Sequence, residues 1–339
     1  MMMMMFIQIF IWIILTYYSE CESIIGSSCN CKAHSYDFNV PEDARQRIDF
    51  LCCDGKQTDD ANNHNDQQHL NQLIEKINDG KIFVDQFIIR SLNPELIFQH
   101  DSLEINWLEI SNIDMNSYQF ASQHKNLYIH QLVISNVRMY RQLLYFIQSS
   151  WNHLEMIHLD SYQLIDDDRL QPPYHFLIFN QPFEVYSKLK TLNMIRCNIK
   201  SLAGVDLLKN VANLRMLSLA HNQLTSIDNV NFFPADSKEF RSLDLSYNQL
   251  RWLPANWKLP SSLTHLHLDN NEITIFPNNV YHLNNLREFW FQQNRQSCEN
   301  VKRIFQKKIP EIFICWTDKI VTMNKTNNIV EYIARFHRD

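Results

Sequence analysis

The stretch Leu214-Arg-Met-Leu217-Ser-Leu219-Ala-His-Asn222-Gln-Leu224 decides the fold, because the second half of the chain repeats it. Copies begin at Phe240, Leu263 and Leu286, and a variant copy begins at Leu189. They share the pattern L-x-x-L-x-L-x-x-N-x-L, in which other apolar residues replace some leucines and the last copy matches as far as its asparagine. A segment that returns at a fixed period of about 20–50 residues indicates a solenoid, in which each repeat stacks on the next.

Each repeat is expected to hold a short strand at its L-x-L core. Side chains alternate along a strand, so Leu217 and Leu219 should point into the core while Ser218 points outward. The asparagine that follows should end the strand and bond the backbone of the turn, which makes a ladder through the stacked repeats. Removing one such buried partner should cost about 1–3 kcal/mol. No repeat can bury its apolar face alone, so stacking supplies the stability.

The pattern matches the consensus of leucine-rich-repeat proteins at its anchor positions, and the chain resembles that family. The resemblance implies an α/β repeat solenoid: a horseshoe with a parallel sheet on its concave face and disulfide-stapled caps at both ends. In the variant copy Cys197 occupies the asparagine position, a substitution that the consensus permits. We therefore interpret Cys197 as a buried structural thiol and not as a nucleophile.

The first half of the chain keeps the period in weaker form. Ile105-x-x-Leu108-x-Ile110-Ser-Asn-Ile113 and Ile129-x-x-Leu132-x-Ile134-Ser-Asn-Val137 match each other at a spacing of 24 residues. Further strands are expected from Val84, which would be the first, and from Leu154. Residues 81–295 are thus expected to hold about nine repeats, five of them strong from 189 onward. The excess of about ten residues between 159 and 189 is interpreted as a protruding loop.

The cysteines gather at the two ends of the repeats. Five of the eight precede residue 54, two follow residue 297, and only Cys197 lies between. This distribution favours two disulfide-stapled caps in an oxidising compartment, at 21–80 with a polar loop and at 296–339 with a tail. Caps are needed because an open solenoid end would expose its core. A zinc site is disfavoured, because the cysteine spacing is unlike that of a zinc knuckle.

The N-terminal cysteines resemble the cap of extracellular leucine-rich-repeat proteins, in which the first cysteine pairs with the third and the second with the fourth. The resemblance implies Cys21–Cys31 and Cys29–Cys52 and leaves Cys53 over. The alternation of Ile48, Phe50 and Cys52 favours Cys52 over its neighbour. Cleavage after Ser23 would instead remove Cys21, and the other four cysteines could then form two bridges. At the other end, Cys298 and Cys315 are expected to tie the C-terminal cap together.

An apolar run at 6–15 follows five methionines at the start of the chain. It is shorter than the roughly 20 residues of a membrane-spanning helix and fits the centre of a secretory signal peptide, although the usual preceding positive charge is missing. We expect residues 1–20 to be a signal peptide, with an uncleaved anchor as the alternative, and the mature protein to be soluble, secreted and extracellular. Asn324-Lys-Thr326 is an N-glycosylation sequon, so modification of Asn324 is expected.

Composition argues against several function classes. A net charge of −6 disfavours nucleic acid as a partner. The chain has only four glycines, and no two lie close enough for a phosphate-binding loop, a dinucleotide fingerprint or a nucleophile elbow. Repeats and caps leave no room for a catalytic domain, and no catalytic set or cofactor is expected.

The expected function is a secreted, non-enzymatic scaffold that uses its concave face to bind a protein ligand or partner subunit, without stable membrane insertion. The alternatives are an intracellular regulatory protein of the same fold and the platform of an enzyme complex. The order of signal, cysteine cap, weak repeats and strong repeats also resembles a group of arthropod secreted leucine-rich-repeat proteins that includes the non-catalytic subunit of a shrimp luciferase. That resemblance implies an accessory role in adhesion, recognition or assembly.

The strand positions between the core residues should form solvent-facing columns across the sheet. Trp290 stands out, because its place in the strand register would expose a large aromatic side chain to solvent. Aromatic residues are enriched among interface anchors. The alternatives are an ordinary solvated surface and coverage of Trp290 by the C-terminal cap. The predicted binding residues are Asp244, Tyr247, His265, His267, Asp269 and Trp290.

The side chains of His265-x-His267-x-Asp269 share one face of a strand and are of the types that bind metals, with Asp244 or His221 as a fourth ligand. Residues two apart on a strand are separated by about 7 Å, which is wide for one ion, so no metal is expected. The acidic run 166–168 is interpreted as part of a solvated loop.

Overall fold

The computed structural model describes residues 46–54, 68, 71, 74–75, 82–92, 103–114, 127–139, 153–161, 163–164, 188–202, 211, 213–227, 237–255, 257, 259–277, 283–297 and 300–301. The chain divides into two units. Unit 1 comprises 1–154 and 162–166, and unit 2 comprises 155–161 and 167–339.

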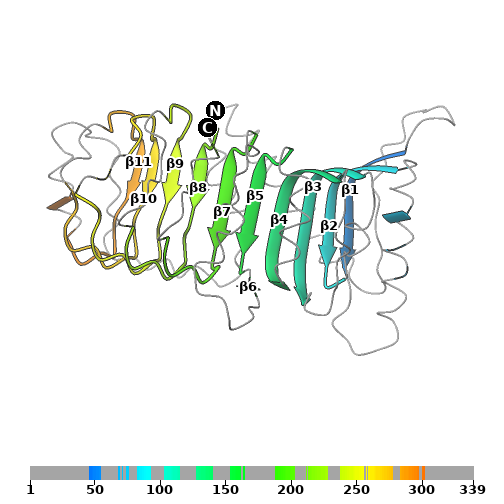
Figure 1. Ribbon diagram of the computed structural model, residues 1–339, viewed down its shortest axis with the longest axis horizontal. Helices are drawn as coiled ribbons and strands as arrows, with labels where there is room; N and C mark the ends of the chain where they lie inside the picture. Colours follow the sequence, from blue (N-terminus) through cyan, green and yellow to red (C-terminus); the bar gives the residue numbers. More distant parts are fainter. Residues whose placement is uncertain are drawn as a thin grey trace, which may run out of the picture. The chain divides into compact units, whose positions relative to one another are not determined.

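Unit 1 holds long parallel strands (Figure 1). They are β1 (Gln46–Asp54), β2 (Ile82–Arg90), β3 (Leu103–Asp114), β4 (Leu127–Met139) and the two-residue β6 (Gln163–Leu164). The order is β1-β2-β3-β4, and β6 pairs with the end of β4. β1 corrects the expectation that the strand at Val84 is the first. Its alternating residues pair in parallel with β2, although its cysteines had indicated a cap.

Unit 2 holds shorter parallel strands, one for each repeat (Figure 1). They are β5 (Met156–Asp160), β7 (Thr191–Ile195), β8 (Met216–Ser218), β9 (Ser242–Asp244), β10 (His265–His267) and β11 (Glu288–Trp290). Neighbouring strands pair in chain order, and the register aligns equivalent positions of successive repeats. Leu217, for example, lies beside Leu243, which lies beside Leu266.

The pattern leucines form the core of unit 2, as the alternation predicts. Leu217, Leu219, Leu243 and their equivalents in β10 are fully buried. Toward β11 three phenylalanines replace leucines, and the ring centroids of Phe276 and Phe289 lie 5.4 Å apart. Each repeat therefore buries its apolar residues against those of its neighbour, which is the stacking that the repeat pattern requires.

The predicted asparagine ladder is present in unit 2. Asn222 Oδ1 accepts hydrogen bonds from the backbone N–H of Cys197 and Ile199, at 3.0 and 3.1 Å. Its Nδ2 donates to the carbonyl of Met194 in the preceding repeat and to that of Leu219 in its own. The same arrangement is made by Asn248, Asn271 and Asn294. One amide thus satisfies backbone groups of two repeats at once.

Cys197 takes the asparagine position in β7's repeat, as the sequence indicates. Its thiol is buried and reduced, and it donates to the carbonyls of Leu159 and Ile195 at 3.6 and 3.2 Å. The contact with Leu159 reproduces the backward bond that the asparagine amides make. Cys197 is therefore a structural thiol.

A left-handed residue precedes the asparagine position in every described repeat, which the sequence pattern does not reveal. These residues have φ between 51° and 57° and in unit 2 are Ser161, Arg196, His221, Tyr247, Asn270 and Gln293. A left-handed φ is unfavourable for a residue that has a Cβ atom, so the surrounding hydrogen bonds must impose it. The N–H of Tyr247 indeed donates to Asp269 O at 3.0 Å, and that of His221 to Ser246 O at 3.0 Å.

Unit 1 places asparagine one position earlier. Asn112 and Asn136 are the left-handed residues, and Asn136 Nδ2 donates to Asn112 Oδ1 at 2.9 Å on the surface. Ile113 and Val137 take the ladder position and pair with each other. Since no amide captures the backbone there, pairing continues, and β3 and β4 reach 12 and 13 residues.

Several predictions lie outside the described residues. They are the signal peptide, the sequon at Asn324, the 166–168 run and the cysteines 21, 29, 31, 298 and 315, while only the backbone of Cys52 is described. Within the predicted C-terminal cap, Asn300 and Val301 are described, and both are helical. Within the described part of the chain, no helix is long and apolar enough to cross a bilayer.

Candidate binding surface

The predicted columns lie in register across unit 2. Pairing of β8 to β11 places Ser218, Asp244, His267 and Trp290 side by side in one column. A second column beside it holds Met216, Ser242, His265 and Glu288. The sequence alignment therefore located these neighbours correctly, although they are 23 to 26 residues apart along the chain.

The predicted exposure of these columns is wrong. Ser218, Asp244 and His267 are buried, and Trp290 is half-buried. Parallel strands lie about 4.8 Å apart, so side chains in one column close on one another. Ser218 Oγ donates to Asp244 Oδ2 at 3.4 Å, and the rings of His267 and Trp290 stack at 4.7 Å with planes 14° apart.

Glu288 joins the two histidines of β10. Nε2 of His267 donates to Glu288 Oε1 at 3.1 Å, and Nε2 of His265 lies 3.8 Å from Glu288 Oε2. Burial lowers the pKa of His267, but the hydrogen bond to Glu288 and the charges of Asp244, Glu288 and Asp269 outweigh it, so the pKa is raised. His267 thus holds its proton more firmly than a free histidine. The stack on Trp290 fixes its ring.

The two aspartates differ in how fully they are bonded. Asp244 Oδ1 accepts from the N–H and the hydroxyl of Ser246, at 2.9 and 2.7 Å. Asp269 is only 2% exposed, and its Oδ2 accepts from Asn270 Nδ2 at 2.7 Å. Its Oδ1 is buried without a hydrogen-bond partner. Burial and the charge of Asp244 raise the pKa of Asp269 to about 6.

Tyr247 is the most exposed of the predicted binding residues. Its side chain is 43% exposed, and its ring stacks on His221 at 4.1 Å with planes 11° apart. Burial and the charge of Arg196 lower the pKa of His221, so this histidine is neutral at pH 7. The two rings come from adjacent left-handed positions, which the backbone holds rigidly. Tyr247 is thus a fixed aromatic platform at the edge of the buried columns.

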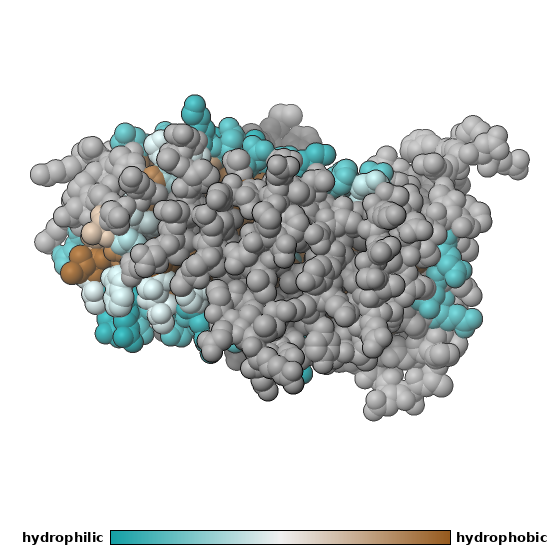
Figure 2. All heavy atoms as spheres, in the orientation of Figure 1, coloured by the Kyte–Doolittle hydropathy of each residue, from teal (hydrophilic) through white to brown (hydrophobic). Residues whose placement is uncertain are grey.

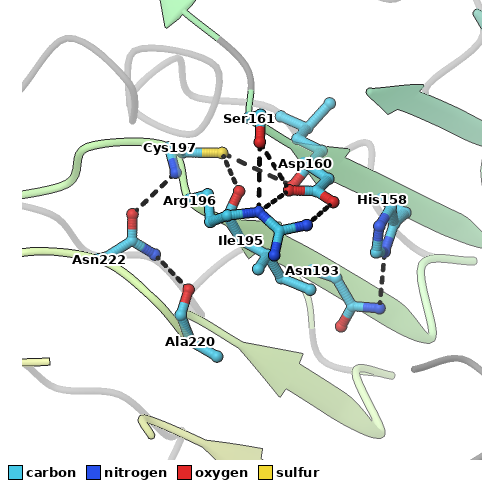
Figure 3. Close-up of polar contacts among 10 residues, drawn as sticks. His158, Asp160, Ser161, Asn193, Ile195, Arg196, Cys197, Ala220 and Asn222 are labelled. Carbon is cyan, nitrogen blue, oxygen red and sulfur yellow. Dashed lines mark hydrogen bonds and ion pairs between the residues drawn. The ribbon is translucent and has the colours of Figure 1, made fainter. Parts of the chain in front are cut away.

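A second polar cluster, on β5 and β7, was missed by the sequence reasoning (Figure 3). Arg196 donates through Nε to Asp160 Oδ1 at 2.8 Å and through a terminal nitrogen to Asp160 Oδ2, while Ser161 Oγ donates to Asp160 Oδ1 at 3.1 Å. Asn193 Nδ2 donates to His158 Nδ1 at 3.3 Å. The available signal was a pair of opposite charges one position apart in the register, where Asp160 lies beside Ile195, but the long insertion between the two repeats hid it.

The hydrogen bonds of this cluster indicate a structural role. The Ser161 hydroxyl bonds a carboxylate and not an imidazole, so it has no base to activate it. Burial lowers the pKa of His158 to about 4, although Asp160 opposes the shift, and the ring is neutral at pH 7. Figure 3 shows Asp160 and Arg196 bridging the two repeats, which is a tie between neighbours. The described residues contain no group of three metal-ligating side chains placed to hold an ion.

Hydrophobic surface appears in Figure 2 toward the end of unit 2 where β10 and β11 lie. Among the described residues, the exposed large apolar side chains besides Tyr247 are Trp252 and Ile275, at 50% and 71% exposure. They occupy equivalent positions, each four residues after the ladder asparagine of its repeat. They belong to the segment after the turn and not to the columns.

Residues 262–283, which contain β10 and Asn271, match the family described as Leucine Rich Repeat. The match agrees with the parallel strands and the ladder, and the chain folds as a leucine-rich-repeat solenoid.

Among curated proteins the chain is similar to lumican. Lumican of Mus musculus is 29% identical over 178 residues, which cover 46% of this chain and 52% of that protein. Lumican of Oryctolagus cuniculus is 34% identical over 130 residues, which cover 32% of this chain and 66% of that sequence. The chain spans about half the length of the lumicans it first matches.

A solved structure of a Leptospira interrogans LRR protein is 20% identical, with a TM-score of 0.49, and the match covers 74% of this chain and 56% of that one.

Proposed function

We propose that this protein is a secreted, non-enzymatic scaffold that binds a protein partner on the surface of β9, β10 and β11. The observation that carries the proposal is the rigid aromatic pairing at both margins of this surface. Tyr247 stacks on His221, and Trp290 stacks on His267. Large aromatics already fixed in place lose little conformational entropy on binding, so they make effective interface anchors.

The partner is expected to cover the half-exposed margin, because the middle of the surface is buried. Tyr247 is 43% exposed, and the side chains of His265 and Glu288 are 22% and 31% exposed. A partner that closes over this margin would shield the buried polar groups from water, which strengthens their interactions. Asp244, His267 and Asp269 then act from below the surface: they support its shape and set its electrostatic potential.

Secretion is supported by the apolar start of the chain and by the cysteines gathered at both ends. The similarity to lumican and the layout shared with arthropod secreted leucine-rich-repeat proteins fit a scaffold role. The non-enzymatic reading is supported by two described side chains of nucleophilic type, since the hydroxyl of Ser161 and the thiol of Cys197 both make structural contacts. An intracellular regulator or a platform in an enzyme complex is the alternative.

The test is recovery of partners from conditioned medium with the purified mature protein, in wild type and in the Tyr247→Ala, Trp290→Ala double variant. Trp252→Ala is the matched control, since it removes an equally exposed aromatic away from the columns. We expect a partner that wild type and control recover equally and that the double variant loses by at least about tenfold, because each interface anchor contributes 2 kcal/mol or so.

Circular dichroism and the melting temperature must show that the double variant is folded. Equal recovery by all three proteins would remove the proposed surface, and absence of the protein from the medium of expressing cells would remove secretion. Turnover of any substrate class by the pure protein would favour the enzyme-platform alternative.

A further inference from the structure

Three carboxylates surround His267 at the centre of the β9–β11 surface. Glu288 accepts its Nε2–H at 3.1 Å, and the charges of Asp244 and Asp269 also act on its ring. Arg196 pairs with Asp160, Arg295 pairs with Glu272, and Arg241 donates to the carbonyl of Lys238. The cluster therefore concentrates negative charge in a region of low polarity, where an added cation would be strongly favoured.

Buried oxygen atoms in the same place lack hydrogen-bond partners. Asp269 Oδ1 is buried and unbonded, and Asp269 is only 2% exposed. Gln292 is the second residue after β11 and lies beside Asp269 in the register, because the N–H of Asn270 donates to Gln292 O. Its amide oxygen is a second buried acceptor without a hydrogen-bond partner. Native proteins bond nearly all buried polar atoms, and these oxygens call for a donor.

An aromatic plane borders the cluster on the side that meets solvent. Trp290 is half-buried and stacks on His267, while His265 and Glu288 form a partly exposed margin beside it. The ring face of tryptophan attracts cations. Carboxylates, unbonded acceptors and an indole ring together define a site for a cationic group that donates several hydrogen bonds.

We propose that this cluster binds the ammonium or guanidinium group of a lysine or arginine side chain presented by the protein partner. Such a group enters beside the half-buried Trp290 and Gln292, pairs with Asp244 and Asp269, and donates to the unbonded oxygens of Asp269 and Gln292. Three donors on an ammonium, or five on a guanidinium, match the number of free acceptors better than a single-donor group. This inference rests on the proposed function and names the chemistry of the partner's contact.

The probe is a fluorescein-labelled hexalysine peptide, with a hexapeptide of acetyl-lysine as the uncharged counterpart. Fluorescence anisotropy is measured with the full mature chain at an ionic strength of about 0.15 M, which screens distant surface charge. The variants are Asp244→Asn and Asp269→Asn, which keep side-chain shape. Glu239→Gln is the matched control, because it removes the same charge from an exposed ion pair with Arg215.

We expect hexalysine to bind wild type and the Glu239→Gln variant within twofold of each other, and the acetylated peptide to bind neither. Each aspartate variant should weaken binding at least about tenfold, as expected for loss of a charge-assisted hydrogen bond. If Asp244→Asn lowers the melting temperature, Asp269→Asn carries the test, since the side-chain hydrogen bond of Asp269 is made with its sequence neighbour Asn270. An equal loss in all three variants, or no binding to folded wild type, overturns the proposal.

The two proposals can fail separately. A partner lost by Tyr247→Ala, Trp290→Ala but unaffected by both aspartate variants would keep the binding surface and remove the cation site. Aspartate-dependent hexalysine binding with equal partner recovery by all variants would keep the cation site and remove the proposed protein-binding role.

Discussion

Unit 1 and unit 2 share one repeat period but end their strands in different ways. In unit 2 the ladder asparagines capture the backbone just after each strand, and β8 to β11 are three residues long. In unit 1 Ile113 and Val137 fill that position, pairing runs on, and β3 and β4 are four times as long. The same period therefore supports two modes of stacking, one through buried amides and one through extended strand pairing.

The ladder comparison yields the largest expected effect. Asn248→Ala leaves the N–H of Leu224 and the carbonyls of Leu219 and Leu245 without their buried partner. We expect a loss of about 3 kcal/mol in the free energy of unfolding, at the upper end for a buried unsatisfied group. Urea denaturation followed by circular dichroism measures it.

Asn136→Ala is the matching change in unit 1, where the asparagine is exposed and bonds only another side chain among its described contacts. The expected loss is within about 0.5 kcal/mol. Comparable losses in the two variants would show that the units do not differ in the way described.

Substitution of buried acidic residues gives the next largest expected effect on stability. The pKa of Asp269 is raised to about 6, so the native state binds a proton between about pH 4 and 6 that the unfolded chain does not. The stability that the protonated carboxyl group contributes is therefore lost as the pH rises from about 4 to about 6. Asp269→Asn should be more stable than wild type by roughly 2 kcal/mol at pH 7, and the advantage should shrink as pH falls toward 4.

Unit 1 offers the comparison in Glu109, whose pKa is raised by burial while Arg90 opposes the shift. Glu109→Gln should show the same sign of pH dependence. Thermal unfolding of both variants across pH 4 to 7 is the measurement. An advantage of Asp269→Asn that grows as pH falls would contradict the assignment.

The left-handed positions give a smaller effect. Tyr247→Gly should be more stable than Tyr247→Ala by about 1 kcal/mol, because both lose the stack on His221 but only glycine adopts φ near 53° without strain. The same pair of substitutions at Gln249, the second residue after Tyr247, should favour alanine. A preference for alanine at both positions would mean that the turn relaxes on substitution.

Ser242→Ala is expected to have the smallest effect. Its hydroxyl is buried and unbonded, so its removal should leave stability unchanged or raise it by about 0.5 kcal/mol. Ser218→Ala, which breaks the bond to Asp244, should instead lower stability by about 1 kcal/mol. A clear loss of stability in Ser242→Ala would show that this hydroxyl has a partner after all.

Much of this architecture could be predicted from the sequence because the repeat carries it. Leucine spacing gives the strands and their register, and Asn222 with its equivalents gives the ladder. Burial of the columns was not predictable, because alternation tells which face a side chain takes but not how closely Ser218 and Asp244 approach. The left-handed column escaped notice because residues as different as Arg196 and Tyr247 occupy it.

The candidate site shows the same division. The neighbours Asp244, His267 and Trp290 followed from alignment, whereas the role of Glu288 depended on a side-chain contact between columns. The tie between Asp160 and Arg196 was hidden by an insertion of irregular length. β1 was not predicted, because its cysteines indicated a cap although its apolar residues alternate as in a strand.

The thiol at Cys197 has a consequence for how this chain can vary. An asparagine in the ladder serves two repeats, so neither can lose it without harm to the other, and inheritance holds such repeats to a common spacing. The thiol of Cys197 donates to Ile195 in its own repeat and to Leu159 in the preceding one, and it reaches Leu159 across 38 residues where the asparagines span 26 to 29. The link that spans the most sequence is thus the one beside the long insertion. Over generations, this is the joint at which the array could accept new length.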